Sequence, residues 1–252
     1  MKTAIITGAS AGLGLEFVAQ LEEFFPEIEC VWLISRSVDK LASAAKLLKK
    51  AEAKIVPLDL CSEADTDKFE ALLKEEKPEI SLLVNNAGCG YLANIGDTDY
   101  KVQTRMVDLN IRALTAITAI SVPYIINGGR IINMSSIASF CPNPRMTVYS
   151  ASKSYVSAFS RGLEEELKPR KISVTAVCSG PLDTEFLDIA GIRGQSKTFD
   201  VLPFCNPKNV VSGAYKAARK GHSVHTPRAF FKFYRFVAKI VPQSLMVKFT
   251  KT

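Results

Sequence analysis

The sequence predicts an α/β fold in one domain, with a parallel sheet of about seven strands and helices on both faces. Short apolar segments alternate with longer helical segments along most of the chain, which is the pattern of repeated strand–helix–strand units. The chain has 252 residues, of which 47% are hydrophobic, and this suits one large domain better than two small ones. A glycine-rich loop between the first strand and the first helix adds a ligand-binding signal.

The first unit of the chain is a strand, a glycine loop and a helix. Lys2–Thr7 has the apolar character of a short buried strand, and the helical segment 15–25 ends before Pro26. Glycines let a backbone approach a ligand closely, and free N–H groups at a helix start hold a phosphate. The unit therefore predicts a phosphate-binding loop, with a plain tight turn as the alternative. The loop contains Gly8, Ser10, Gly12, Leu13 and Gly14.

The end of the second strand predicts which dinucleotide binds. Segment 30–34 is that strand, and Ser35 and Arg36 follow it. In a dinucleotide-binding fold, a carboxylate at this position bonds the ribose 2′-hydroxyl of NAD, whereas an arginine accommodates the 2′-phosphate of NADP. The chain has Arg36 and no carboxylate there, because Asp39 already lies inside the next helical segment. A preference for NADP is predicted.

The remaining elements alternate in the same way. Asn85 and Asn86 end the fourth strand, where two amides can tie neighbouring strands and leave the following glycine backbone beside a ligand; an asparagine-rich turn is the alternative. Segment 191–201 is predicted as a mobile loop. The other predicted helices are 39–50, 62–76, one or two within 99–126, 154–168 and 207–220, and the other predicted strands are 53–57, 78–84, 130–134, 171–177 and 222–226.

Tyr149 and Lys153 form the most informative pair. Their spacing of four places both side chains on one face of a helix, one turn apart, near the start of a helix that Pro169 ends. A phenol has a reference pKa of about 10, and a lysine ammonium together with the helix N-terminus is expected to lower the pKa of Tyr149. The pair then suits proton transfer at an alcohol or carbonyl oxygen, whereas an ordinary amphipathic helix start is the alternative.

Charge, cysteine usage and hydropathy limit the class of protein. Residues 201–252 carry ten Lys and Arg and no Asp or Glu, whereas residues 1–200 carry 22 against 25, so the net charge of +7 comes from the C-terminal part. The six cysteines are scattered without a CxxC pair, and His222 and His225 lack companion ligands, so no metal site is expected. No secretory signal or bilayer-spanning segment is expected. A cytoplasmic location is predicted, without a nucleic-acid partner.

Together these motifs resemble those of the short-chain dehydrogenase/reductase family, to which the chain is similar as far as about residue 226. Each motif alone is weak, but five of them in this order and spacing are specific. The resemblance implies a Rossmann fold over residues 1–226 with residues 227–252 as an extension. It also implies hydride transfer between a nicotinamide cofactor and a carbinol carbon. The motifs are the TGxxxGxG loop from Thr7 to Gly14, the element Asn85-Asn86-Ala87-Gly88, Asn110, Ser136 and the pair Tyr149 and Lys153.

The resemblance implies a role for each matching residue. Tyr149 would be the general acid and base, and Ser136 would hold and polarise the substrate oxygen. Lys153 would bond the nicotinamide ribose and lower the Tyr149 pKa, and Asn110 would hold a water in a proton relay to Lys153. Among the implied cofactor-binding residues, Asp59 and Leu60 would lie beside the adenine, and Gly180 and Thr184 beside the nicotinamide. The other implied cofactor-binding residues are Gly8, Ser10, Gly12, Leu13, Gly14, Arg36, Asn86, Ala87, Gly88, Tyr149 and Lys153.

Two positions depart from the family pattern. Ser179 stands where the family usually has a proline before the glycine that is Gly180 here. Ala11 stands where many NADP-using members carry a basic residue in the glycine loop. Arg36 would then make most of the contact with the 2′-phosphate.

Apolar side chains after the fifth and sixth strands, in segments 137–146 and 182–204, predict a bulky apolar ketone or alcohol as substrate. Packing alone would explain these side chains equally well, and a steroid, an acyl chain and a small aromatic ketone stay open. A 3-oxoacyl reductase acting on carrier-bound chains is one alternative. A catalytically silent NADP-binding regulator is another, which the presence of all four catalytic residue types disfavours. The side chains are Phe140, Met146, Phe186, Leu187, Ile189 and Phe199.

Residues 227–252 are rich in aromatic and basic side chains and lie outside the resemblance. Three roles are open: an amphipathic segment at an anionic membrane surface, a cover over the substrate pocket or a subunit contact, and docking of an acidic acyl carrier. The family implies a homodimer or homotetramer through the helices around Asn110 and Tyr149. The aromatic and basic residues are Arg228, Phe230, Phe231, Lys232, Phe233, Tyr234, Arg235, Phe236 and Lys239.

Overall fold

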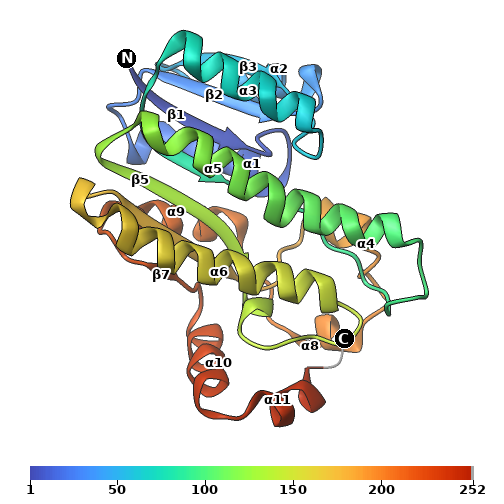
Figure 1. Ribbon diagram of the computed structural model, residues 1–252. Coiled ribbons are helices and arrows are strands. Elements are labelled where there is room, and N and C mark those ends of the chain that lie inside the picture. Colours follow the sequence, from blue (N-terminus) through green and yellow to red (C-terminus); the bar gives the residue numbers. More distant parts are fainter. Residues whose placement is uncertain (251–252) are drawn as a thin grey trace.

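Within residues 1–250, which the computed structural model describes, seven parallel strands form one sheet in the order β3-β2-β1-β4-β5-β6-β7 (Figure 1). The predicted parallel sheet of about seven strands is confirmed. The strands are β1 (Lys2–Thr7), β2 (Cys30–Ser35), β3 (Glu52–Pro57), β4 (Glu79–Asn85), β5 (Ile125–Ser136), β6 (Ser173–Ser179) and β7 (Val224–His225).

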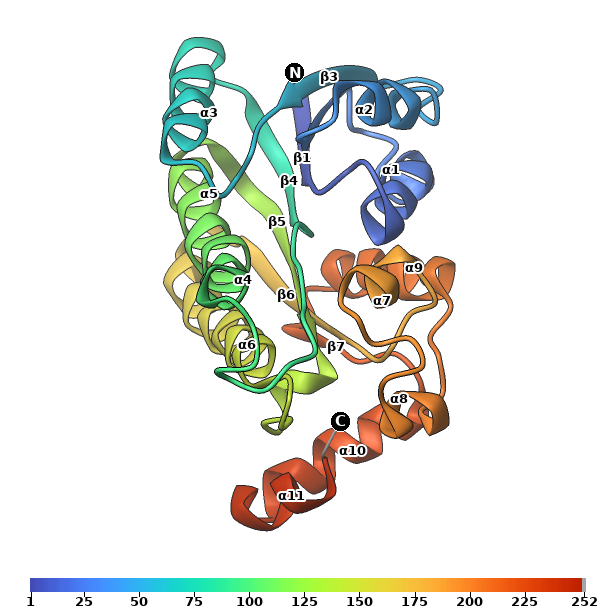
Figure 2. The ribbon, with the colours of Figure 1, turned by 90° about the vertical axis from the view of Figure 1, so that its right-hand side faces the viewer.

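Helices cover both faces of the sheet, as Figure 2 shows. The short helices α7 (Glu185–Ile189) and α8 (Lys197–Val201) follow β6, and α10 (Ala229–Ile240) and α11 (Gln243–Phe249) lie beyond β7. No helix within the described residues is long and apolar enough to cross a membrane. One face carries α3 (Glu63–Glu76), α4 (Tyr100–Val107), α5 (Leu114–Ser121) and α6 (Thr147–Leu167), and the other carries α1 (Gly12–Phe24), α2 (Val38–Ala45) and α9 (Pro207–Arg219).

Each face of the sheet has its own core, because the strands of a covered parallel sheet are apolar on both sides. On the side of α1 and α9, Tyr215 packs edge-on against Phe17 with 5.2 Å between ring centroids and donates its hydroxyl hydrogen to the Phe17 carbonyl at 2.6 Å. On the side of α3, the single tryptophan of the chain, Trp32, is 1% exposed and packs against Phe69. These aromatic contacts fix the helices on the sheet that positions the site.

The direction in which strands are added reverses at β1. This strand lies between β2 and β4, so the chain adds β2 and β3 on one side before it returns to add β4, β5, β6 and β7 on the other. Ligands of open parallel sheets bind beyond the carboxyl ends of the strands at such a reversal. The glycine loop after β1 and segment 85–88 at the end of β4 both begin there. The topology therefore brings the two predicted cofactor motifs together.

The helix predicted over 39–50 is shorter in the structure and ends at Ala45. The Glu22 carboxylate on α1 accepts hydrogen bonds from the backbone N–H groups of Lys49, Lys50 and Ala51 at 2.7–3.1 Å. A side chain from another helix thus satisfies amides that a longer helix would have bonded internally. Local periodicity does not report such a partner.

The helical region predicted over 99–126 is divided, and its end was predicted wrongly. A π-helical turn, Asp108–Ala113, separates α4 from α5, and β5 begins at Ile125 rather than at residue 130. Ile125 pairs with Ile80 of β4, and its carbonyl accepts a hydrogen bond from Arg170. Contacts with distant parts of the chain therefore decide where the strand begins.

Segment 191–201, predicted as a loop, contains the short helix α8. Arg193 pairs with Asp188 at 2.7 Å, and Arg145 donates to the Gln195 carbonyl at 3.0 Å. These contacts tie the segment to α7 and to the residues before α6. The predicted mobility of this segment stays a prediction.

The helix α10 packs against the loops that follow β5 and β6. Its Phe231 ring is fully buried, and a Cβ at Gly180 would lie 2.2 Å from that ring. Tyr234, one turn further along α10, packs against Phe140 with 6.0 Å between ring centroids. The absence of a side chain at Gly180 thus allows α10 to lie directly on the loop after β6.

A series of hydrogen bonds leads from the residue after α11 to α6. The Thr250 hydroxyl donates to the Pro142 carbonyl at 2.8 Å, and Asn143 Nδ2 donates to the Thr250 carbonyl at 3.2 Å. Ser150 of α6 donates in turn to Asn143 Oδ1 at 3.3 Å. The C-terminal segment therefore contacts the part of the chain that leads into α6.

We predict that Gly180→Ala destabilises the fold by about 1–3 kcal/mol, because the added methyl group overlaps the Phe231 ring and α10 must move. Urea unfolding measures the change, and limited proteolysis shows whether cleavage within residues 227–250 becomes faster.

Gly162→Ala is the matched control for this prediction. Gly162 lies inside α6 with no atom near its Cβ position, so alanine there is expected to stabilise the helix by about 0.5–1 kcal/mol. Equal stability of the Gly180→Ala protein and the unsubstituted protein would show that the Phe231 contact is not fixed.

Candidate active site

The glycine loop between β1 and α1 has little room for side chains and leaves a helix start unpaired. A Cβ at Gly14 would lie 1.8 Å from the Gly8 carbonyl oxygen, and Gly8 has a φ of +66°. The N-cap residue of α1, Ala11, makes no side-chain hydrogen bond, and the first turn of α1 carries no acidic residue. The first N–H groups of α1 therefore remain for a ligand, and a phosphate suits such a helix start.

Hydrogen bonds tie the end of β4 to this loop. Thr7 Oγ1 accepts from the N–H groups of Asn86 and Ala87 at 3.0 and 3.1 Å. Asn86 Nδ2 donates to the Thr7 carbonyl at 3.1 Å, and Asn85 Nδ2 donates to Asn133 Oδ1 of β5 at 2.8 Å. The two amides thus tie neighbouring strands, as predicted.

The other predicted loop residues differ in their surroundings. Leu13 packs against the apolar core beneath α1, and Ser10 is half-buried in the loop. Gly88 is exposed, and a Cβ there would lie 3.0 Å from Asn110 Oδ1 and 3.3 Å from Lys153 Nζ. Gly88 therefore lies where the cofactor motifs meet the predicted catalytic residues.

Tyr149 and Lys153 lie in the first turns of α6, as predicted. Lys153 Nζ is 5.7 Å from the centre of the Tyr149 ring, so the two side chains share a face. Lys153 is 6% exposed and donates from Nζ to the Met134 carbonyl at 2.9 Å. Ser136 at the end of β5 lies near the Tyr149 phenol and acts to lower its pKa, and Ser136 Oγ accepts from the Ala138 N–H at 3.2 Å. The predicted serine, tyrosine and lysine therefore converge.

The expected lowering of the Tyr149 pKa is wrong for this arrangement. Burial raises the pKa of Tyr149 from 10.0 to about 12, and the nearby Ser136 side chain offsets this only in part. The Lys153 ammonium is directed to the Met134 carbonyl rather than to the phenol oxygen. Tyr149 is therefore a neutral phenol near neutral pH, which suits it to donate a proton.

Burial acts on Lys153 in the opposite direction. Desolvation lowers the pKa of Lys153 from 10.5 to about 8, with Cys89 and Cys178 acting against this shift. The ammonium is still mostly charged at neutral pH, and it has three donors of which the Met134 carbonyl takes one. Its neighbour Gly88 is exposed. The donors that remain fit the hydroxyl groups of a ribose.

Asn110 lies in the π-helical turn and is 1% exposed. Its Oδ1 accepts from the Cys89 N–H at 2.9 Å, and its Nδ2 donates to the Cys89 carbonyl at 2.8 Å and to Ser152 Oγ at 3.0 Å. A π-helical turn shifts the helix register by one residue and is frequent at functional sites. Asn110 thus joins the loop after β4 to α6, and the water relay implied for it stays a prediction.

Arg36 lies at the end of β2 and is exposed. Burial raises the pKa of Cys89, whereas the nearby positive charges, including those of Lys153 and Arg36, act to lower it. The positive charge of Arg36 therefore acts on the segment that follows β4. A guanidinium in this position suits a phosphate group.

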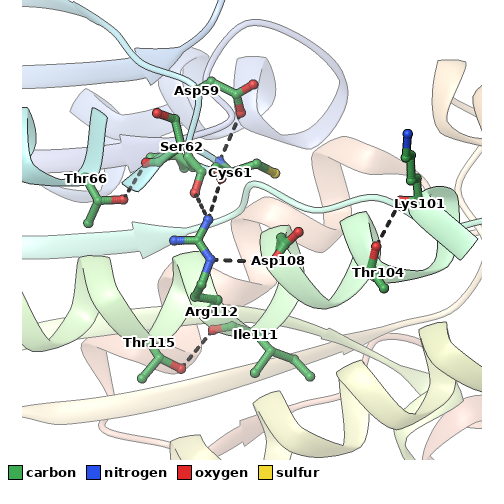
Figure 3. A network of polar contacts seen from close by, with 11 residues as sticks. Asp59, Cys61, Ser62, Thr66, Lys101, Thr104, Asp108, Ile111, Arg112 and Thr115 are labelled. Atoms are coloured by element: carbon green, nitrogen blue, oxygen red, sulfur yellow. Dashed lines mark hydrogen bonds and ion pairs between the residues drawn. The ribbon is translucent and has the colours of Figure 1, made fainter. Parts of the chain in front are cut away.

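The segment that follows Asp59 is held by Arg112 of the π-helical turn, and Figure 3 shows this guanidinium directed to Cys61. Arg112 donates to the Cys61 carbonyl at 2.6 Å and pairs with Asp108 at 3.5 Å. Asp59 Oδ1 accepts from the Cys61 N–H at 3.0 Å. Leu60 is 5% exposed and belongs to the core, so Asp59 supplies the accessible side chain of this pair.

Gly180 and Thr184 lie in the segment that follows β6, and Gly180 lies next to the predicted catalytic serine, Ser136. Ser136 of β5 and Ser179 of β6 are paired in the sheet, so Gly180 directly follows the neighbour of Ser136. Thr184 is the N-cap residue of α7, yet its side chain makes no capping hydrogen bond. Ser179, in place of the usual proline, completes β6 and is 6% exposed.

Apolar side chains gather against Tyr149. Phe186 packs on its ring with 5.9 Å between centroids. Two of the predicted lining residues lie elsewhere, because Phe140 packs against α10 and Ile189 is 67% exposed. The cluster that includes Tyr149 and Phe186 contains Leu92, Met146, Leu187, Ala190, Ile192 and Phe199.

Gly90 and Ser152 belong to the site and were not predicted. A Cβ at Gly90 would lie 2.6 Å from Phe186 Cζ and 3.1 Å from Tyr149 Cδ2, so a side chain there would displace the Phe186 ring that packs on Tyr149. A second glycine two residues after Gly88 is a signal that could have indicated this. Ser152 bonds Asn110 across 42 positions of sequence, and no local pattern indicates such a pair.

The chain belongs to the short-chain dehydrogenase family, because the family model described as short chain dehydrogenase matches residues 2–190. An uncharacterised oxidoreductase of Staphylococcus aureus (strain N315) is 31% identical over 187 residues, which is 73% of this chain and 79% of that relative. The resemblance found in the sequence motifs is confirmed, and the protein is an oxidoreductase of this family. The family match ends before α8, α9, α10 and α11.

Solved structures extend the similarity over nearly the whole chain. A short-chain dehydrogenase from Sphingobium yanoikuyae in complex with NADPH has a TM-score of 0.82 and 28% identity, covering 98% of this chain and 95% of that chain. A 3-ketoacyl-(acyl-carrier-protein) reductase from Brucella melitensis complexed with NADH has a TM-score of 0.76 and 25% identity, covering 90% of this chain and 96% of that chain. These proteins share the arrangement of sheet and helices described above.

We predict that the Lys153 ammonium titrates at about pH 8, well below its usual 10.5, because burial disfavours the charged form. NMR of protein with ¹³C-labelled lysine measures the titration, and Lys153→Arg assigns the signal. Since the unfolded chain binds more protons than the folded chain between these two pH values, the cost of burying this charge decreases as the pH rises through that window. A Lys153 signal that titrates together with the bulk of the lysine signals would show that the ammonium is hydrated.

Proposed function

We propose that this protein is an NADP(H)-dependent oxidoreductase that interconverts a carbonyl group and a secondary alcohol. The convergence of Tyr149, Ser136 and Lys153 beside the unpaired start of α1 carries the proposal. A neutral phenol, a hydroxyl and an ammonium next to a phosphate-binding helix start suit the combined transfer of a hydride and a proton. Asn110 approaches the same place from the π-helical turn.

Each side chain has a task that follows from its contacts. The nicotinamide cofactor, when bound, supplies or accepts the hydride. Tyr149 donates the proton to the carbonyl oxygen, a direction that its raised pKa favours near neutral pH. Ser136 bonds the same oxygen, because its hydroxyl already adjoins the phenol. Lys153 holds the ribose through the donors that Met134 leaves, and Asn110 orients the relay water.

The proposed preference for NADP rests on Arg36. Its exposed guanidinium at the end of β2 has the position that meets the adenosine ribose, and no carboxylate directly follows this strand. The Sphingobium yanoikuyae neighbour was solved with NADPH, whereas the Brucella melitensis neighbour was solved with NADH. Ala11 offers no second positive charge in the glycine loop, so Arg36 is the residue to test.

The proposed substrate is an apolar ketone or alcohol, of steroid, lipid or aromatic type. The apolar cluster around Phe186 and Tyr149 supports this class. A 3-oxoacyl reductase acting on carrier-bound chains is the second candidate, because the Brucella melitensis neighbour is described as a 3-ketoacyl-(acyl-carrier-protein) reductase. The basic C-terminal segment would suit an acidic carrier.

We further propose a cytoplasmic location with peripheral contact to a membrane, and assembly into a homodimer or homotetramer through α4, α5 and α6. Tyr100 and Val107 on α4 are 69% and 41% exposed, which supports a subunit contact on that face.

We predict that Tyr149→Phe lowers kcat by about 10²- to 10⁴-fold, because the proton donor is lost, and leaves cofactor affinity nearly unchanged. Turnover of a panel of ketones with NADPH, and of alcohols with NADP, is followed by absorbance at the nicotinamide band. Fluorescence titration with NADPH measures binding.

Two outcomes would contradict the proposed reaction. Unchanged turnover in the Tyr149→Phe protein would place the chemistry elsewhere. NADPH binding by the unsubstituted protein without turnover of any compound in the panel would favour the catalytically silent regulator.

We predict that Arg36→Asp lowers the ratio of kcat/KM with NADPH to kcat/KM with NADH by at least about tenfold, because the carboxylate repels the 2′-phosphate and accepts a bond from a ribose hydroxyl. Lys46→Asp, which makes the same charge change at the exposed end of α2, is the control. An unchanged ratio in the Arg36→Asp protein would refute the role given to Arg36.

A further inference from the structure

The helix α10 presents three distinct faces to its surroundings. Phe231 and Tyr234 face the protein, where they pack against Gly180 and Phe140. The other residues of the helix recur at spacings of three and four and so line up along two further faces. One of these is apolar and the other is basic.

The apolar face of α10 is exposed along its length. Phe230, Phe233, Phe236 and Ile240 are 52%, 66%, 60% and 65% exposed. Monomeric proteins rarely expose several large apolar side chains in one row without a partner. We call these four residues the apolar row.

The basic face lies beside the apolar row. Lys232, Arg235 and Lys239 recur at the same helical spacing, and Lys232 and Lys239 are exposed. Residues 201–252 contain no Asp or Glu that could neutralise them. An occupant of this surface must therefore accept both exposed phenylalanine rings and positive charge.

A second copy of the chain does not meet both requirements. Packing one apolar row against another would bring two C-terminal regions with ten Lys and Arg each close together without a carboxylate from either, and like charges facing each other oppose association. The interface of an anionic bilayer accepts phenylalanine among its acyl chains and pairs lysine with its headgroups.

We infer that α10 docks this protein on the surface of an anionic lipid bilayer, with the apolar row inserted and Lys232 and Lys239 on the headgroups. The inference deepens the proposed location and does not depend on the proposed reaction. Leu245 and Phe249 of α11, which are 48% and 83% exposed, add apolar surface beyond the end of α10.

The placement of α10 on the protein supports docking without unfolding. Phe231 and Tyr234 hold the helix from the opposite side, so the apolar row can enter a bilayer while these contacts persist. Figures 1 and 2 show α10 and α11 at one end of the molecule, beyond the sheet and its covering helices. A flat surface can therefore reach this end.

The test is co-sedimentation of the full chain with vesicles. Phosphatidylcholine vesicles containing phosphatidylserine are compared with vesicles of phosphatidylcholine alone, at low and high salt. We expect binding to the anionic vesicles that is at least tenfold stronger than to neutral vesicles and weakens with salt. Phe233→Ser with Phe236→Ser, and separately Lys232→Gln with Lys239→Gln, should each reduce this binding at least tenfold.

Matched controls distinguish binding through α10 from non-specific adsorption of the protein to lipid. Val38→Ser with Ile95→Ser removes two exposed apolar side chains outside the C-terminal region, and Lys40→Gln with Lys46→Gln removes two exposed lysines outside it. Both control proteins should bind vesicles as the unsubstituted protein does. Gel filtration of all variants checks that fold and assembly state are kept.

Three results would overturn the inference. The first is absence of vesicle binding by the unsubstituted protein, and the second is an equal loss of binding in the control proteins. The third is a lower molecular mass of the assembly in the Phe233→Ser, Phe236→Ser protein without a change in vesicle binding, which would assign the apolar row to contact with a second copy. Turnover and NADPH binding are measured separately in solution, so the vesicle-binding result can be interpreted even if the proposed reaction fails.

Discussion

The burial of one ammonium group, that of Lys153, constrains the candidate active site. Removing a charge from water is costly unless polar groups surround it, and the Met134 carbonyl at 2.9 Å is the group that β5 supplies. The start of α6 must therefore lie close against the end of β5, and this also brings Tyr149 to Ser136. The same burial raises the pKa of Tyr149 and lowers the pKa of Lys153.

Glycines provide the space that this close packing requires. Gly88 leaves room for Asn110 and Lys153, Gly90 for the Tyr149 ring, and Gly180 for α10. Each glycine lies on a loop at the carboxyl end of a strand, where the chain leaves the sheet. A side chain at any of these positions would push apart groups that now lie in contact, so the packing around the site requires glycine at these positions.

The sequence was sufficient for the order of elements, the glycine loop, the tie made by Asn85 and Asn86, and the shared face of Tyr149 and Lys153, because these depend on local periodicity and strand ends. It was insufficient where a distant group decides the local structure. Glu22 of α1 bonds the backbone amides of residues 49–51, which follow α2, and a longer α2 would have needed these amides for its own hydrogen bonds. The direction of the Tyr149 pKa shift could not be predicted, because spacing shows that Lys153 is near and does not show where its ammonium points.

Trp32 lies in β2, three residues before its last residue, Ser35, and Arg36 follows directly. It is the only tryptophan of the chain, and it is enclosed between the sheet and Phe69. Its ultraviolet emission therefore comes from one rigid position about 10 Å along the strand from Ser35, at a rise of about 3.3 Å per residue. The molecule thus carries a built-in optical reporter whose signal needs no attached dye and no separation from other indole groups.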